Sequence, residues 1–457
     1  MEAQATTISG CTILPMTGSG DVIESGYVNV RNGAITAVAA GEPPAGGGGE
    51  TLIDGRGKVL MPGLVNAHTH LYQVLLRAVW EDMPFLAWLK RIYGVAEALN
   101  PEHALAGTLL GCLENLKGGV TTVCEHNFLN PGPECAVAAV EAISRSGLRS
   151  VFARTVMDTG EIVPDCTKET PETAFTRIEE LMARQRGGDS SPESGRLTFR
   201  TGPNTPPINA SPDLMREIRR FADHHSIGIS AHVAESASVV EVTRREHDRE
   251  GVVAHLKDFG IQGEDAIFAH SVHLSPEEIA HLAETGTCVS HNPVSNMMLG
   301  DGIAPVVEML AAGVRVGLGT DGAASNHSQD LFETIKAASL LQKVKHQDAG
   351  VIDPYSVLRM VTTDGAHALG LGSVCGTVEP GKRADLILVD IQKPHFQPVN
   401  DLFSQLAHCA KSTDVDTVMV DGMLLMRDRQ CTSLDEDEIL RSARAAREDL
   451  MARVSAA

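Results

Sequence analysis

The chain has 457 residues, a formal net charge of −21 and 43% hydrophobic residues. This length exceeds the usual single-domain range, so we expect one large domain with an elaboration, or two to three domains. The acidic charge argues against a nucleic-acid-binding protein, because such proteins present basic surfaces, and it also disfavours anionic membranes. No uncharged apolar run approaches the roughly 18 residues of a membrane span, so we expect none.

The cysteines and the first residues indicate the compartment. Nine cysteines without a C-x-x-C pair are typical of scattered thiols in a reducing compartment rather than of a disulfide framework. The opening sequence MEAQATTISGC lacks the basic and apolar regions of a signal peptide. We therefore expect a cytoplasmic protein.

Short β-like segments occur at both ends of the chain. The sequence GYVNVRNGAITAVAA contains Asn32-Gly33, a hairpin turn signal, and the C-terminal part contains ADLILVDI and TVMVDGMLLM. Neither end is long enough for a sheet of its own, so we expect one small composite β-sandwich domain built from residues 1–60 and 376–457. The last segment, 436–457, has the pattern of an amphipathic helix packed on the outside.

Residues 61–375 alternate between β-rich segments and helical patterns. Such alternation indicates parallel strands joined by crossovers, and eight units in one domain predict an α/β fold, a TIM-like (β/α)8 barrel. The expected strands are residues 59–70, 120–126, 149–156, 197–204, 228–235, 266–273, 287–293 and 315–323.

Titratable side chains recur where the expected strands end. His68 and His70 end the first strand, and because side chains alternate along a strand, residues two apart face the same side. The other strand ends carry His232 and Glu235, His270 and His273, and Asp321. The active site of such a barrel lies at the carboxyl ends of its strands. The pattern therefore predicts a metal site in the barrel mouth.

The ligand types indicate which metal it is. Three imidazoles and one carboxylate suit a borderline divalent ion, most often Zn²⁺, with Fe²⁺ as an alternative. Such an ion lowers the pKa of bound water towards neutrality. Glu235 lies three residues beyond His232, too far along the turn to share the metal but well placed to move protons at a substrate.

Several of these segments carry a resemblance to a known family. PGLVNAHTHLYQVLLRA, AHVAES, AHSVHL, SHNPVSNMMLGDGIAPV and GLGTDGAASN are similar to the successive signature segments of the amidohydrolase superfamily. GKRADLILVD and VDTVMVDGMLLM are similar to the closing strands of its composite β domain. The resemblance spans nearly the whole chain. Within the superfamily it is strongest to deaminases of 5′-methylthioadenosine and S-adenosylhomocysteine, and triazine hydrolases are close to that group.

The resemblance implies roles residue by residue. The residues that match the mononuclear metal ligands are His68, His70, His232 and Asp321. Glu235 matches the proton shuttle, and His270 matches the histidine that activates or orients the water. Binuclear members generally need a bridging residue, commonly a carboxylated lysine, but the only lysine between residues 118 and 230 is Lys168, in a polar stretch. We therefore expect one divalent ion, no organic cofactor, and a homo-oligomer.

Four residues match substrate-binding positions of the deaminases. Glu81 matches a glutamate that holds the ribose hydroxyls, Arg154 an arginine near the ribose, and Ser325 a serine near the heterocycle. Asn204 departs from the pattern, because it stands where those deaminases usually have a histidine that contacts the base.

We expect a zinc-dependent deaminase of an amino-substituted N-heterocycle, with adenosine thioethers as the preferred substrates. The alternatives are a triazine hydrolase that releases ammonia or chloride, a guanine or 8-oxoguanine type deaminase, and a non-catalytic metal-binding barrel. GLGTDG (317–322) satisfies the dinucleotide pattern G-x-G-x-x-G, but it closes the series of strands instead of opening a nucleotide-binding unit. The roles of Glu125, His126 and His291 are left open.

Overall fold

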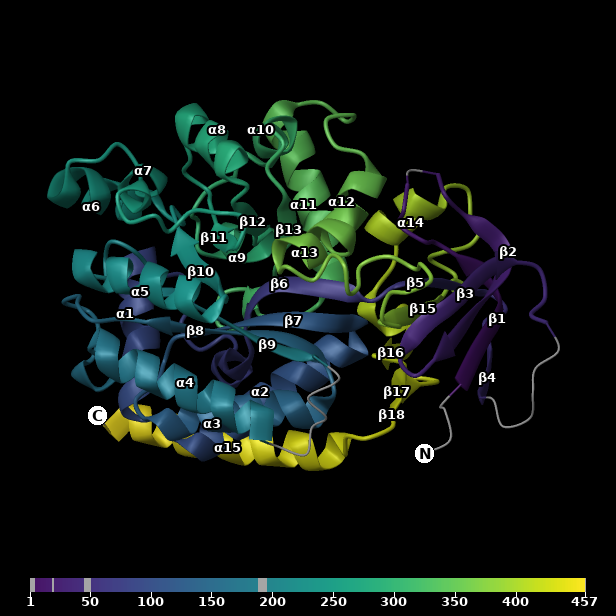
Figure 1. Ribbon diagram of the computed structural model, residues 1–457, viewed down its shortest axis with the longest axis horizontal. Coiled ribbons are helices and arrows are strands. Elements are labelled where there is room, and N and C mark those ends of the chain that lie inside the picture. The colour runs from purple at the N-terminus through teal and green to yellow at the C-terminus, as the bar shows by residue number, and fades with distance from the viewer. Residues whose placement is uncertain (1–4, 19, 45–50, 188–194, 457) are drawn as a thin grey trace.

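The computed structural model describes residues 5–18, 20–44, 51–187 and 195–456. Its centre is a barrel of parallel strands surrounded by helices (Figure 1). The barrel strands are β6 (Leu64–His70), β7 (Val120–Asn127), β8 (Arg149–Val156), β9 (Leu197–Pro203), β10 (Gly228–Val233), β11 (Ala266–His270), β12 (Cys288–His291) and a last strand in two pieces, β13 (Val316–Leu318) and β14 (Asp321–Gly322). The predicted (β/α)8 fold is confirmed, and each of its eight expected segments contains a strand.

Helices cover the outer face of this barrel, and 3-10 turns join some of them. They are η1 (Leu71–Leu76), α1 (Phe85–Gly94), α2 (Pro101–Lys117), α3 (Pro133–Ser146), α4 (Pro171–Gly187), α5 (Pro212–His225), α6 (Ala237–His247), α7 (Val252–Lys257), α8 (Pro276–Thr285), α9 (Pro293–Met298), α10 (Val306–Ala311), α11 (Leu331–His346), α12 (Pro354–Met360) and α13 (Thr363–Ala368). None of the helices in the described ranges combines the length and apolar character that crossing a bilayer requires.

Side-chain alternation along the strands creates two apolar layers. On β8, Val151 and Ala153 belong to a small cluster inside the barrel, together with residues of β6, β7, β11 and β12. Phe152 and Val156 face the other way and pack in the large layer between strands and helices. Phe152 is fully buried, and burying such a side chain contributes about 1.5–3 kcal/mol. The same alternation decides which polar side chains reach the barrel mouth.

The barrel closes through its divided last strand. β13 pairs with β12, whereas β14 pairs with β6 through Asp321 opposite Thr69. Between the two pieces, the Thr320 N–H donates to the Asn66 side-chain oxygen at 3.0 Å instead of to a main-chain carbonyl of a neighbouring strand. Residues 315–323 were expected to form one strand. The division places Asp321 beside the end of the first strand.

Strands from both ends of the chain form one second sheet, which confirms the composite β domain. Its strands are β1 (Ala5–Ile13), β2 (Ile23–Arg31), β3 (Ala34–Ala40), β4 (Thr51–Asp54), β5 (Lys58–Pro62), β15 (Leu386–Asp390), β16 (Val415–Val420), β17 (Met423–Arg427) and β18 (Gln430–Cys431). β5 lies between β1 and β15, so a strand from each terminus flanks it. The expected hairpin joins β2 to β3, with Asn32 and Gly33 at φ values of 51° and 79°, as the turn requires.

The expected first strand, residues 59–70, is two strands that belong to different sheets. β5 is part of the composite domain and β6 is part of the barrel. Gly63 separates them, and a Cβ atom there would lie 2.0 Å from the Thr121 side chain. The chain can therefore pass from one sheet to the other only because this position has no side chain.

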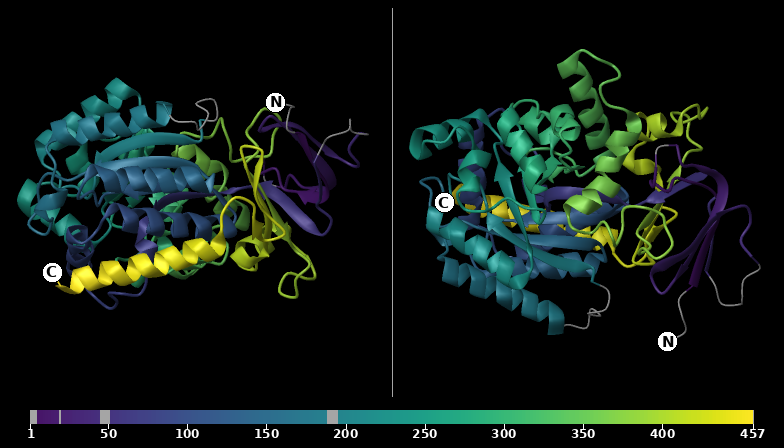
Figure 2. Two further views of the ribbon diagram at one scale, coloured as in Figure 1. Left: turned by 90° about the horizontal axis from the view of Figure 1, so that it is seen from below. Right: turned by 45° about the horizontal axis from the view of Figure 1, so that its top comes forward.

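The last helix leaves the composite domain and returns to the barrel. After α14 (Leu402–His408) and the strands β16 to β18, α15 (Glu436–Ala456) runs along the outside of α2 (Figures 1 and 2). It buries Ile439, Ala443 and Leu450, as the amphipathic pattern predicts. The ring of His103 on α2 lies 2.9 Å from the Asp449 carboxylate on this helix.

Candidate functional site

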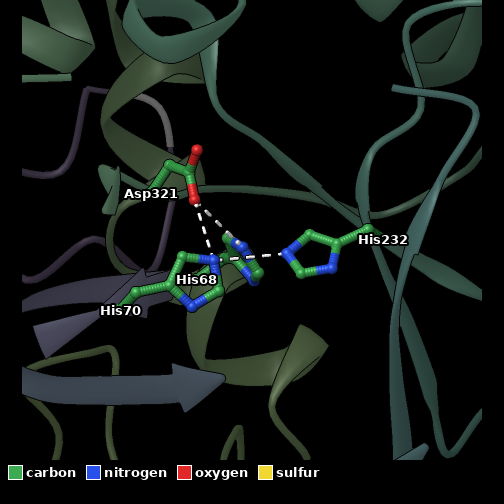
Figure 3. A group of neighbouring side chains, drawn as sticks. All are labelled: His68, His70, His232 and Asp321. Carbon is green, nitrogen blue, oxygen red and sulfur yellow. Dashed lines mark hydrogen bonds and ion pairs between the residues drawn. The ribbon is translucent and has the colours of Figure 1, made fainter. Parts of the chain in front are cut away.

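Four side chains from three strands converge in the barrel mouth. His68 and His70 come from β6, His232 from β10 and Asp321 from β14 (Figure 3). The Asp321 Oδ1 atom lies 3.4 Å from Nε2 of His68 and 3.1 Å from Nε2 of His70. The Nε2 atoms of His232 and His70 are 3.2 Å apart, and one ligand atom from each residue lies within 4.8 Å of the others. The predicted ligands are therefore brought together.

The imidazoles are held in the tautomer that a metal ion requires. His70 Nδ1 lies 2.6 Å from the His126 carbonyl oxygen and His232 Nδ1 lies 2.9 Å from the Asn204 carbonyl oxygen. Because a carbonyl only accepts, both Nδ1 atoms carry the proton, and the Nε2 lone pairs face the centre. Burial lowers the pKa of His68, and the pKa of His232 lies well below its ordinary value for the same reason. Neutral imidazoles are metal ligands.

Asp321 completes the group as its anionic member. Burial raises the pKa of this carboxyl, but the ring nitrogens of His68 and His70 close to it outweigh burial and hold the pKa well below its ordinary value. Its Oδ2 atom accepts hydrogen bonds from the Ser295 and Ser325 hydroxyls at 2.6 and 2.8 Å. The buried His68 Nε2 atom has no hydrogen-bond partner among the described residues. Three imidazoles around one carboxylate oxygen fit a divalent metal ion.

Glu235 and His270 form a second close group with Asp321, beside the other three ligands. Burial, followed by the charges of Asp301 and Asp321, raises the pKa of Glu235 well above its ordinary value. His270 Nε2 lies 3.5 Å from the Glu235 carboxyl, and burial lowers the pKa of His270 to about 3. Asn296 Nδ2 donates to His270 Nδ1 at 2.9 Å, so the proton of this neutral ring is on Nε2. The pair thus offers a carboxyl that holds its proton more strongly than an ordinary glutamate and an N–H group.

A small cavity of about 20 Å³ lies among these groups. Its lining residues are His70, Gln73, Trp88, Leu89, Phe128, Asn204, Thr205, His232, Glu235, His270 and Asp321. A second cavity, lined in part by Glu81, Ser325 and His327, adjoins it, because Trp88 lines both. The Glu81 carboxylate is half-exposed and lies 3.3 Å from Nδ1 of His327. Two of the expected substrate residues, Glu81 and Ser325, therefore lie on one side of the metal ligands.

Arg154, expected near the ribose, lines neither of these two cavities. On β8 it shares the face of Phe152 and Val156, which pack in the outer layer. Its Nη2 atom donates to Glu169 at 2.6 Å, and its side chain is buried. Strand alternation directs it away from the barrel interior, a consideration that motif matching does not include.

Asn204 lines the inner cavity, but its side-chain amide is already bonded within the protein. Its Oδ1 atom lies 3.1 Å from His126 Nε2, and its Nδ2 atom donates to the Tyr93 hydroxyl at 3.0 Å. His126 is thus in contact with the site, although it is not in the ligand group. Sequence reasoning left its role open.

Glu125 and His291 are buried and lie outside the ligand group. Burial raises the pKa of Glu125 to about 7, and its Oε2 atom accepts from the Leu71 N–H at 2.7 Å. Burial lowers the pKa of His291 to about 3. Neither residue lines the two cavities around the ligands.

Ser295 and Asn296 were not singled out in the sequence, although they contact Asp321 and His270. Both lie in the motif SHNPVSNMMLGDGIAPV, directly after β12, on α9. The sequence did offer one indication of their role, because both residues follow soon after the end of a predicted strand.

Comparisons with known proteins agree with this geometry. Residues 59–425 match the amidohydrolase family. A 5-methylthioadenosine/S-adenosylhomocysteine deaminase of Syntrophomonas wolfei is 36% identical over 96% of this chain and 97% of its own. A 5′-deoxyadenosine deaminase of Methanothermobacter thermautotrophicus is 36% identical over 98% of this chain and 100% of its own. The crystal structure of an adenosine deaminase from Xanthomonas campestris with bound zinc superposes with a TM-score of 0.89 at 30% identity, covering 98% of each chain. The chain belongs to the amidohydrolase family.

Proposed function

We propose that this protein is a zinc-dependent hydrolytic deaminase of an aminopurine nucleoside. The observation that carries the proposal is the position of the buried Glu235 carboxyl, which lines the same cavity as the metal ligands and whose pKa is raised by burial. A deaminase needs such a proton donor for a ring nitrogen. The relatives named as deaminases of 5′-methylthioadenosine, S-adenosylhomocysteine and 5′-deoxyadenosine support the substrate class.

We infer that the metal is held by His68, His70, His232 and Asp321 and that it is zinc, as in the Xanthomonas campestris structure. When bound, the ion supplies a hydroxide nucleophile at neutral pH by lowering the pKa of water.

The reaction replaces the amino group of the ring by oxygen, consuming water and releasing ammonia. Glu235 donates its proton to the ring nitrogen next to the carbon that is attacked, and it takes a proton back from the new hydroxyl group as the ring carbonyl forms. His270 offers its Nε2–H to the attacking oxygen, since its Nδ1 is occupied by Asn296. Asp321 takes the proton that the attacking water loses and passes it to the leaving amine. Two serine hydroxyls on Oδ2 orient its carboxylate for this transfer.

The second cavity supports a nucleoside rather than a free base. Glu81 presents a carboxylate there, which can accept hydrogen bonds from two adjacent ribose hydroxyls. Trp80, Met83 and Leu299 give the same cavity an apolar side that suits an uncharged 5′ substituent. The reducing compartment, the cytoplasmic location and the homo-oligomer stay predictions.

The test is a turnover screen of zinc-loaded protein. Adenosine thioethers, 5′-deoxyadenosine, guanine, amino-triazines and a chlorinated triazine are offered separately, and released ammonia and chloride are both measured. We expect ammonia from the adenosine derivatives. Chloride release without any ammonia, or no turnover on any amino compound, would refute the deaminase.

A further inference from the structure

We propose that Asn204 and His126 form a positioning pair that fixes two metal ligands, His70 and His232, and that Asn204 does not read the substrate's base. The inference rests on the proposed metal site. It assigns a role to a position that lines the cavity and to a histidine outside the ligand group.

The first argument is that the Asn204 amide has no donor left for a substrate. One N–H donates to the Tyr93 hydroxyl at 3.0 Å and the other is directed at Met157 Sδ at 3.5 Å. A purine ring nitrogen presents a lone pair and so needs a donor. Asn204 is also 1% exposed, so its amide cannot turn without leaving buried groups unpaired, which costs free energy.

The second argument concerns the main-chain carbonyls of the same two residues. The Asn204 carbonyl accepts hydrogen bonds from both the backbone N–H and the ring Nδ1 of His232, each at 2.9 Å. The His126 carbonyl accepts from His70 Nδ1 at 2.6 Å. These carbonyls decide which ring nitrogens of the two ligands face the metal.

The third argument is that one side-chain hydrogen bond joins the two carbonyl-bearing residues. His126 Nε2 donates to Asn204 Oδ1 at 3.1 Å. His126 Nδ1 in turn lies 3.1 Å from the hydroxyl of Ser230, two residues before His232 on β10. The His126 ring also lies against the His232 ring, with centroids 4.2 Å apart. Strands β7 and β10 are not neighbours in the sheet. The hydrogen bond between His126 and Ser230 therefore fixes the spacing of these two strands across the barrel mouth.

The chain of hydrogen bonds continues away from the metal. Tyr93, on α1, also accepts from Asn209 Nδ2 at 2.8 Å, and Asn209 Oδ1 accepts from the Thr205 N–H at 2.8 Å. The loop after β9 is thereby anchored to α1. Asn204 connects this chain of hydrogen bonds to a metal ligand, because its main-chain carbonyl accepts from the ring of His232.

The test compares Asn204→Leu and His126→Leu with the wild-type protein. The readouts are the zinc dissociation constant from chelator competition, the visible spectrum of Co²⁺-substituted protein, and kcat and KM. Loss of support behind metal ligands typically weakens metal binding about 10- to 100-fold. We expect a loss of that size, a changed Co²⁺ spectrum, and a fall in kcat that exceeds any change in KM.

Conservative and matched variants separate this role from general stability. Asn204→Asp and His126→Gln keep a hydrogen-bonding atom between the two residues and should recover part of the zinc affinity. His103→Leu removes another buried histidine with a side-chain partner, far from the metal on α2, and should lower stability without changing zinc affinity. If Asn204→Leu does not fold, Tyr93→Phe, which removes one partner of the Asn204 amide, carries the same test with a smaller expected loss.

The opposite result is equally clear. If Asn204→Leu keeps its zinc affinity and Co²⁺ spectrum while KM for the nucleoside rises, then Asn204 contacts the substrate and the inference is wrong. If the wild-type protein deaminates no substrate, the proposed function fails, but zinc affinity and the Co²⁺ spectrum still decide the role of this pair.

Discussion

The Thr69 hydroxyl, between the two ligand histidines of β6, donates to the Gln329 side-chain oxygen at 2.8 Å. The same oxygen accepts from Asn115 and Thr320, and Gln329 Nε2 donates to the Asp321 carbonyl at 3.1 Å. Gln329 is fully buried. One amide therefore joins the first strand, the last strand and α2 at the seam where the barrel closes.

Gln329→Leu should loosen this seam. It leaves several buried hydroxyl and amide groups unpaired, which we expect to lower the free energy of unfolding by about 2–4 kcal/mol and to weaken zinc binding about tenfold. Denaturant unfolding and chelator competition measure the two effects. Gln405→Leu is the control, because Gln405 bonds several main-chain groups outside the barrel. Unchanged zinc affinity in Gln329→Leu would show that the seam does not position the ligands.

Glu235→Gln should keep its metal and lose its activity. The amide has the size of the carboxyl but no proton to give, and loss of a general acid typically costs about 10²–10⁴ in rate. Metal content by elemental analysis and kcat for deamination are the measurements. Full activity with full metal content would refute the role of Glu235.

The rate should fall as pH rises through the pKa of Glu235. Burial raises that pKa, so the carboxyl is protonated below the raised value and is lost as a donor above it. A profile of kcat/KM from about pH 5 to about pH 10 should show this alkaline limb. A constant kcat/KM through the alkaline range would mean that another group protonates the ring.

Glu81→Ala should weaken the binding of ribosides more than that of substrates with fewer sugar hydroxyls. Without the carboxylate at the second cavity, we expect KM for 5′-methylthioadenosine to rise about 10- to 100-fold, since hydrogen bonds to a charged group are lost. A 2′-deoxy analogue should lose less, because it makes fewer of these bonds. Equal losses for the riboside and the 2′-deoxy analogue would place Glu81 away from the sugar.

Chelation of the metal should lower the thermal stability of the protein. A ligand present at about 100 times its Kd stabilises the folded state by about 2.7 kcal/mol, and the ligand group here is buried. Differential scanning calorimetry of chelated and zinc-restored protein measures the difference. A transition unchanged by zinc would argue against the site.

The strands were predictable because short β-rich segments alternate with helical patterns along residues 61–375. Residues 149–156 form β8 with the predicted bounds. The divided last strand was not predictable, because it depends on Thr320 bonding to Asn66, a residue 254 positions away. The ligand residues followed from strand ends and motifs. The environments of Arg154 and Asn204 could not be predicted in this way, since their partners Glu169 and His126 come close only in the folded chain.

The place of β5 in the composite sheet has a consequence for synthesis. β5 is made early, yet one of its edges is covered only by β15, Leu386–Asp390, near the end of the chain. Until the ribosome has released that segment, the nascent N-terminal sheet exposes an open strand edge, the kind of surface that recruits other strands. The two termini must therefore find each other after translation of the whole barrel, and chaperone dependence should concentrate in that interval.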